Sequence, residues 1–234
     1  MEISGIQKVS LIDYPGKIAC TIFLYGCNFK CGFCHNPELV VFAPEKKFSW
    51  HEVLDYLDLR KKYLDGVCIS GGEPLMSLDK EFLRKIKSLG YSIKIDTNGC
   101  FPERLNELID EKLVDFVAMD IKASKEKYKD VAGCEVDFKK IEESIRIITS
   151  KMWDYEFRTT VVEGLHDEKE MENIALWLKE ISGRKPRKFV LQGFKNQGKI
   201  IGEDYKTKND TSREYIYGLK DKLKDFFLEV EVRV

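Results

Sequence analysis

The chain has 234 residues, of which 43% are hydrophobic, so it can bury the core of one domain of generous size. Its 39 Lys and Arg residues nearly balance its 40 Asp and Glu residues, and a net charge of −1 argues against binding nucleic acid or an anionic membrane surface. No stretch approaches the roughly 20 apolar residues that a membrane helix needs, and no secretory signal is visible, so we expect a cytoplasmic protein.

Short β-rich apolar runs alternate along the chain with charged amphipathic segments. The runs predict strands over 18–25, 66–70, 91–96, 116–121, 155–162 and 188–193, and an edge strand over 228–234. The amphipathic segments predict helices over 50–63, 78–89, 102–112, 137–150, 168–181 and 212–227. Ser49 and Glu52 form a predicted capping box before the first helix, and Gly90 and Gly183 follow two predicted helix ends.

Strand–helix alternation of this kind implies parallel strands joined by right-handed crossovers. Six such units form either an open doubly wound sheet or an incomplete barrel, because a closed barrel of eight units takes about 250 residues. No repeat or linker interrupts the chain, so we expect residues 1–234 to form a single domain. In either architecture, reactive groups are expected at the C-terminal ends of the strands.

A cysteine-rich loop follows the first predicted strand. The segment CNFKCGFC places Cys27, Cys31 and Cys34 in a C-x-x-x-C-x-x-C spacing. Three thiolates on one loop can bind three of the four iron atoms of a cubane cluster. The fourth iron then has no protein ligand and can bind a substrate, just as a catalytic zinc binds substrate at its open coordination position. One alternative is a Cys3His zinc site that uses His35, but the adjacent Cys34 and His35 reach one ion with difficulty. The other is three thiols without a metal.

Polar motifs follow the next three predicted strands. The segment SGGEP contains Gly71, Gly72 and Glu73, and paired glycines let the backbone approach a ligand. The two strands after it end in DTNG and in MDIK. An Asn-Gly pair is ordinarily a turn, and an acid and a base on one face are often a surface ion pair. These two motifs supply Asp96, Thr97, Asn98, Asp120 and Lys122.

Two further positively charged residues lie in the last predicted units. Arg158 stands between apolar neighbours in the predicted strand over 155–162, where a guanidinium is usually paired. Lys195 follows the strand over 188–193. Cys20 and Cys68 lie in strands and read as small buried hydrophobes. Neither His51 nor His166, which lies in a polar segment, is assigned a catalytic role.

The cysteine spacing, with the aromatic Phe33 before the third cysteine, resembles the signature of radical S-adenosylmethionine (SAM) enzymes. GGEP, DTNG, D-x-K and Arg158 follow in the order seen in glycyl-radical-enzyme activases, most nearly pyruvate formate-lyase activase. The resemblance implies a partial (β/α)6 TIM-like barrel, the radical SAM core. It also implies a [4Fe–4S] cluster on the three cysteines, whose open iron SAM chelates. Reduction of the cluster would cleave SAM to a 5′-deoxyadenosyl radical.

The same resemblance implies roles for the other motif residues. It places Phe33 near the adenine, and Gly71, Gly72 and Glu73 around the amino group of SAM. Asp96 and Asp120 would help to hold SAM, with a bound monovalent cation as a further candidate, and Lys122 belongs to the same element. Thr97 would assist, Asn98 would contact the ribose and Arg158 the SAM carboxylate. Lys195 stands where the activases have a histidine.

The opening segment SLIDYPGK resembles that of the anaerobic ribonucleoside-triphosphate reductase activating proteins. We therefore expect an oxidoreductase that installs a glycyl radical on a partner, with this reductase as the leading candidate and a flavodoxin or ferredoxin as electron donor. No catalytic residue is expected beyond the cluster and SAM ligands. One alternative is a radical SAM enzyme with a small-molecule substrate, similar to 7-carboxy-7-deazaguanine synthase. Another is a zinc or iron–sulfur module without activity.

Overall fold

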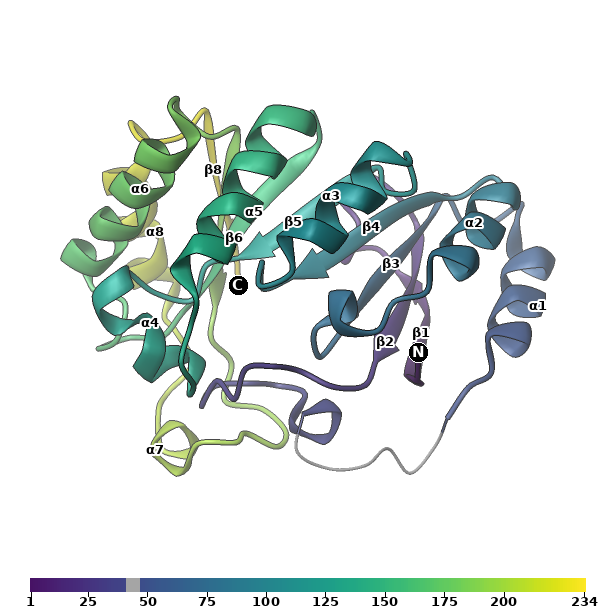
Figure 1. Ribbon diagram of the computed structural model, residues 1–234. Coiled ribbons are helices and arrows are strands. Elements are labelled where there is room, and N and C mark those ends of the chain that lie inside the picture. Colours follow the sequence, from purple (N-terminus) through teal and green to yellow (C-terminus); the bar gives the residue numbers. More distant parts are fainter. Residues whose placement is uncertain (41–46) are drawn as a thin grey trace. The chain divides into compact units, whose positions relative to one another are not determined.

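The computed structural model describes residues 1–40 and 47–234 (Figure 1). Contacts between Cα atoms divide the chain into two compact units. Unit 1 comprises residues 1–28, 38–97 and 101–118, and unit 2 comprises residues 29–37, 98–100 and 119–234. The single domain expected over residues 1–234 stays a prediction, and each unit is described below by itself.

Unit 1 contains the first four strands and the N-terminal part of the fifth. Strand β1 pairs antiparallel with β2, whereas β2, β3 and β4 pair parallel to one another. These strands are β1 (Ile3–Ser10), β2 (Ala19–Leu24), β3 (Gly66–Gly71), β4 (Ser92–Thr97) and β5 (Phe116–Asp120). Its helices are α1 (Trp50–Arg60), α2 (Lys80–Ser88) and α3 (Pro102–Asp110), and it contains the short 3-10 segment η2 (Pro74–Met76). A second 3-10 segment, η1 (Pro37–Leu39), has its first residue in unit 2 and the other two in unit 1.

The helices of unit 1 begin where the side chains can cap them. Ser49 accepts a hydrogen bond from the backbone N–H of Glu52, and the Glu52 carboxylate accepts one from the backbone N–H of Ser49, so the predicted capping box is confirmed. Asp79 caps α2 through the N–H of Glu81. The buried side chains of α2, Phe82, Leu83 and Ile86, lie on one face of that helix.

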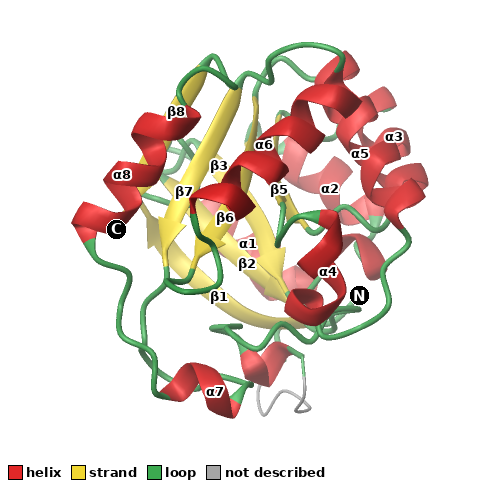
Figure 2. Cartoon of the chain, turned by 90° about the vertical axis from the view of Figure 1, so that its left-hand side faces the viewer, coloured by secondary structure: helices red, strands yellow, loops and turns green. Residues whose placement is uncertain are grey.

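Unit 2 contains three parallel strands and five helices. Strand β7 pairs with both β6 and β8. The elements are β6 (Tyr155–Val161), β7 (Lys188–Gly193), β8 (Glu229–Arg233), α4 (Lys125–Ala132), α5 (Phe138–Lys151), α6 (Glu168–Ser182), α7 (Glu203–Lys206) and α8 (Arg213–Leu223). Helix α6 lies between α5 and α8 and contacts both of them (Figure 2). Gly183 ends α6 in the left-handed conformation, with φ 63°, as predicted.

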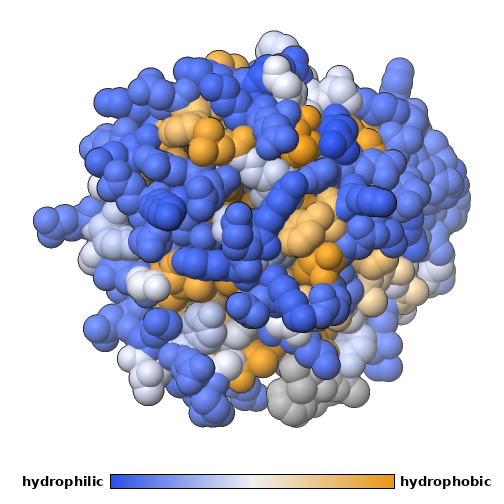
Figure 3. Space-filling model, turned by 60° about the vertical axis from the view of Figure 1, so that its left-hand side comes forward, coloured by the Kyte–Doolittle hydropathy of each residue, from blue (hydrophilic) through white to orange (hydrophobic). Residues whose placement is uncertain are grey.

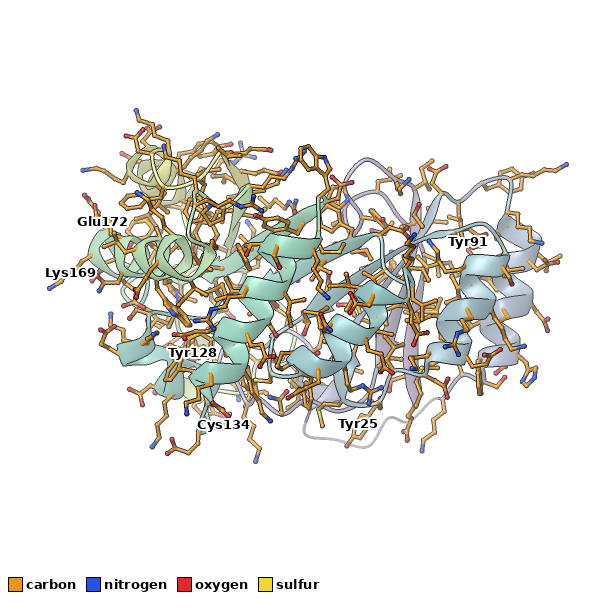
Figure 4. All side chains as sticks on the ribbon, turned by 45° about the horizontal axis from the view of Figure 1, so that its top comes forward. Tyr25, Tyr91, Tyr128, Cys134, Lys169 and Glu172 are labelled. Carbon is orange, nitrogen blue, oxygen red and sulfur yellow. The ribbon has the colours of Figure 1, made fainter. Side chains whose placement is uncertain are left out.

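Aromatic rings fill the space under the helices of unit 2. Tyr128 of α4 contacts Phe138 and Trp177 edge-on, with ring centroids 5.8 and 6.0 Å apart. In Figure 4, Lys169 and Glu172 point outward from α6, away from Tyr128. Burial of Tyr128 therefore joins α4 to the two longer helices after it, although the sequence pattern did not predict α4.

The strand order over the chain is β1-β2-β3-β4-β5-β6-β7-β8, which is the order of the sequence. Every predicted strand is confirmed within two residues at each end, and β8 is an edge strand as expected. The prediction missed β1, α4 and the short α7. In the parts of the chain that the structure covers, no helix has the length and apolar character to cross a membrane. Polar side chains cover most of the face in Figure 3.

Candidate active site

In unit 1, the Gly-Gly turn packs against the backbone that leads to Cys27. Gly71 has φ 124°, and a Cβ on Gly72 would lie 2.0 Å from the carbonyl oxygen of Gly26. The N–H of Gly72 donates to Leu24 O at 2.9 Å, and the N–H of Glu73 donates to Gly26 O at 2.7 Å. The glycines therefore join the end of β3 to the start of the cysteine loop.

Glu73 is a buried carboxylate whose side chain is held by two donors. Its residue is 1% exposed, and its Oε1 accepts from the N–H of Leu75 at 3.1 Å and from the hydroxyl of Thr97 at 2.8 Å. The first contact caps η2, and the second connects the SGGEP motif to the end of β4. Two of the predicted SAM residues thus contact each other directly.

Asp96 lies one residue before Thr97 and has an ion pair that the sequence analysis did not predict. Its Oδ1 pairs with the ammonium of Lys94, whose side chain is 1% exposed. Its Oδ2 accepts from the hydroxyl of Ser70 at 3.0 Å. The Lys94 ammonium also lies 3.6 Å from Sγ of Cys68, which faces it across the paired strands. The carboxylate of Asp96 is therefore balanced within unit 1.

In unit 2, the loop with Cys31, Phe33 and Cys34 is held on two sides. The N–H of Lys30 donates to Ala132 O at 2.8 Å, and the N–H of Gly202 donates to Gly32 O at 2.9 Å. The N–H of Cys34 donates to Cys31 O at 3.0 Å, which closes the turn between the two thiols. These contacts fix the cysteine backbone between the C-terminal end of α4 and the segment before α7.

Phe33 is 3% exposed and lies between two aromatic side chains. Its ring centroid is 6.4 Å from that of His166 and 5.8 Å from that of Tyr205, and both contacts are edge-on. The Tyr205 ring also occupies the space that a Cβ on Gly32 would need. Packing alone therefore orients the Phe33 ring, which is the aromatic residue of the cysteine signature.

Asp120 carries two positively charged partners at the end of β5. The guanidinium Nε of Arg158 donates to its Oδ1 at 3.0 Å, and the Lys122 ammonium donates to its Oδ2 at 3.1 Å. Burial alone would raise the pKa of Asp120, but Arg158 and Lys122 outweigh it and lower the pKa to about 2. The two cations that donate to this carboxylate are also groups that can attract an anionic ligand.

The side chains of Asn98 and Lys195 each contact another residue of unit 2. The Asn98 side-chain oxygen accepts from the N–H of Cys100 at 3.0 Å, which closes the predicted turn, and Asn98 is 5% exposed. The ammonium of Lys195 lies 3.6 Å from the Asp210 carboxylate and its side chain is 42% exposed. Their predicted contacts with SAM stay predictions.

The thiols differ in their surroundings. Burial raises the pKa of the Cys31 thiol to about 11, although the Lys122 cation lowers it. Burial also raises the pKa of Cys20 to about 12, as expected for a structural thiol. None of the seven cysteines forms a disulfide. Among the described residues, no three His, Cys, Asp or Glu side chains converge as metal ligands.

Sequence reasoning missed two buried side chains. His166 was read as part of a polar segment, but it is fully buried, with its Nδ1 accepting from the N–H of Val162 at 3.1 Å and its Nε2 lying 2.9 Å from Lys122 O. Lys94 was read only as part of a strand. For Lys94 the signal was a charged residue among the apolar residues of a strand. For His166 the neighbouring sequence gave no such signal, because its burial depends on elements distant in sequence.

The predicted site residues are divided between the units. Unit 1 contains Cys27, Gly71, Gly72, Glu73, Asp96 and Thr97. Unit 2 contains Phe33, Cys31, Cys34, Asn98, Asp120, Lys122, Arg158 and Lys195. Within the units, the structure brings Glu73 to Thr97 and brings Asp120 to Lys122 and Arg158. Thr97 and Asp120 are the last residues of β4 and β5, where the barrel expectation places reactive groups, whereas Arg158 lies in the middle of β6.

Comparisons with known proteins agree with this arrangement. Residues 21–178 match the model of the radical SAM superfamily. One relative is a Methanocaldococcus jannaschii protein that is named as a glycyl-radical enzyme activating enzyme. It is 39% identical to this chain over 184 residues, which are 76% of this chain and 75% of that protein. The pyruvate formate-lyase-activating enzyme of Clostridium pasteurianum is 35% identical over 182 residues, 72% of each chain.

The fold is also similar to that of solved structures. The crystal structure of Streptococcus suis SuiB bound to S-adenosylmethionine matches with a TM-score of 0.67 and 13% identity, over 91% of this chain and 51% of SuiB. The expected α/β fold, a partial TIM-like barrel, is therefore confirmed. Enzymes of this superfamily use a [4Fe–4S] cluster and SAM. The family match therefore favours the cluster over the alternative of a Cys3His zinc site. The chain belongs to the radical SAM superfamily and, within it, to the family of glycyl-radical enzyme activating enzymes.

Proposed function

We propose that this enzyme installs a glycyl radical on anaerobic ribonucleoside-triphosphate reductase. The observation that carries the proposal is the identity with activating enzymes over about three quarters of the chain, 39% in the case of the Methanocaldococcus jannaschii protein. The choice of reductase depends on the segment Ser10–Lys17, SLIDYPGK, which resembles the activators of that enzyme. A flavodoxin or ferredoxin would supply the electron, and a reducing cytoplasm would suit cysteines that form no disulfide.

Cys27, Cys31 and Cys34 would hold the cluster. Their chemistry fits, because iron–sulfur clusters are bound by soft thiolate ligands, and the three thiols form no disulfide and stand on one loop. When bound together, the cluster and SAM would supply a 5′-deoxyadenosyl radical that takes a hydrogen atom from a glycine of the partner. The chain's own part is to fix the loop backbone through Lys30 and Gly32.

The polar clusters would orient SAM by charge. Glu73, held by Leu75 and Thr97, would accept hydrogen bonds from the SAM amino group. The positive cluster of Lys122 and Arg158 around Asp120 would attract the SAM carboxylate. Gly71 and Gly72 would keep the backbone close to the ligand. Phe33 would lie against the adenine, Asn98 would contact the ribose, and Lys195 would supply a positive charge where the activases have a histidine.

Electron paramagnetic resonance tests this proposal directly. Anaerobically reconstituted, reduced protein is incubated with SAM and candidate glycyl radical enzymes, and the expected result is a glycyl-radical doublet on the ribonucleotide reductase. Variants with Cys27, Cys31 or Cys34 replaced by alanine serve as controls and should lose both iron and SAM cleavage. SAM cleavage without a doublet on any such enzyme would instead support the small-molecule alternative. A doublet on pyruvate formate-lyase alone would show that the reductase is the wrong partner.

A further inference from the structure

Lys94 is a buried cation in the middle of a strand. Its side chain is 1% exposed, and its ammonium contacts the Asp96 carboxylate and, at 3.6 Å, Sγ of Cys68. An ammonium in such a place is retained only where a counter-charge compensates for its lost hydration. Asp96 provides that charge from two residues further along the same strand face.

Asp96 has donors on both carboxylate oxygens. Lys94 pairs with Oδ1 and the hydroxyl of Ser70 donates to Oδ2 at 3.0 Å. The pair of Lys94 and Asp96 is neutral, so it exerts little net attraction on a further cation. An alkali ion that binds Asp96 would have to lose some of its water molecules. The attraction of a carboxylate already paired with an ammonium would not compensate for that loss of hydration.

Asp120, the second carboxylate considered for a cation, is also compensated within its own unit. Arg158 and Lys122 donate to its two oxygens at 3.0 and 3.1 Å. Each oxygen of this carboxylate already accepts a hydrogen bond from a cationic donor, which a metal ion would have to displace. The residues on which a bound monovalent cation was expected therefore do not fit one.

We propose that Lys94 is a fixed counter-cation of Asp96 and that SAM binding by this enzyme requires no alkali metal ion. The inference rests on the proposed function, since it concerns the site at which SAM would bind. Lys94 acts through Asp96 and is therefore a positioning residue. It pairs with Oδ1 of the carboxylate, while the hydroxyl of Ser70 donates to Oδ2, and so fixes the orientation of the carboxylate at the end of β4.

Equilibrium binding of SAM to the cluster-loaded wild-type protein is the first test. Titrations are compared in potassium chloride, sodium chloride and tetramethylammonium chloride at equal ionic strength. The expected result is the same affinity in all three salts. Binding that requires potassium or sodium would overturn this inference alone, whereas absence of SAM binding in every salt would refute the proposed function as well.

A Lys94→Ala variant provides the second test, because the shorter side chain leaves room for an ion. In tetramethylammonium, SAM binding should weaken about tenfold or more, the loss expected for one charge-assisted contact. Potassium or sodium should restore most of the affinity, and the sodium NMR signal should broaden with the variant but not with the wild type. Equal weakening in every salt, or wild-type affinity throughout, would contradict the role of Lys94.

Lys87→Met is the matched control. The Lys87 ammonium lies 2.8 Å from the carboxylate of Asp115, but this pair is at the surface of unit 1. Its loss should leave SAM affinity unchanged in all three salts, and a salt response equal to that of Lys94→Ala would refute the inference. If Lys94→Ala does not fold, the wild-type salt comparison still decides the question.

Discussion

Gly72→Ala tests whether the Gly-Gly turn supports the cysteine loop. The added Cβ would lie 2.0 Å from Gly26 O, 2.5 Å from Gly26 C and 3.1 Å from the backbone nitrogen of Cys27. Real Cβ atoms do not approach backbone atoms so closely, so one strand end must move. The hydrogen bond from Glu73 N to Gly26 O, now 2.7 Å, would be lost in the process.

The magnitude follows from these two effects. Overpacking in a rigid environment costs about 1–3 kcal/mol, and the lost hydrogen bond adds about 1 kcal/mol. We therefore expect Gly72→Ala to lower the free energy of unfolding by about 2–4 kcal/mol. Because Gly26 directly precedes Cys27, the variant should also bind less iron after anaerobic reconstitution.

Gly218→Ala is the matched control for this substitution. Gly218 lies in the interior of α8, and a Cβ there would meet nothing within 4 Å. Alanine is the better helix former, so the control should be as stable as the wild type or more stable by up to about 1 kcal/mol. Urea unfolding and iron analysis measure both variants. Wild-type stability and iron content in Gly72→Ala would refute the reasoning.

Two further predictions concern ion pairs. The lowered pKa of Asp120 means that its pairing stabilises the fold above the ordinary carboxyl pKa of 3.8 and that this contribution is lost as the pH falls toward about 2. Asp120→Asn should thus be less stable than the wild type by about 2 kcal/mol near neutral pH. Urea titrations at several pH values should show this difference in stability shrinking below about pH 4. A difference that does not change with pH would contradict the lowered pKa of Asp120. Arg233 donates to both oxygens of the fully buried Glu156 at 2.9 and 2.8 Å, so Arg233→Met should cost about 3–5 kcal/mol of unfolding free energy. Glu231→Gln, which alters a partly exposed partner of both Arg233 and Lys188, should cost no more than about 1 kcal/mol, and equal losses would refute the importance of the buried pair.

Local sequence alone determined most elements and the chemistry of the motifs. Period-two and helical patterns are properties of contiguous residues, so strands such as β7 and helices such as α6 were predicted almost residue by residue. The cysteine spacing and the order of the motifs likewise need no tertiary information. The helix caps at Ser49 and Gly183 depend only on neighbouring backbone and were also predicted correctly.

The tertiary structure decided which of these residues are partners. Strand β1 was missed because its residues become a strand only through pairing with β2, with register shifts on both sides of its centre. Lys94 and His166 looked like ordinary polar residues until neighbouring elements buried them. The glycines of SGGEP were read as ligand contacts, but their closest neighbours are backbone atoms of Leu24 and Gly26. Burial and ion pairing depend on contacts between distant segments, and no local pattern records those contacts.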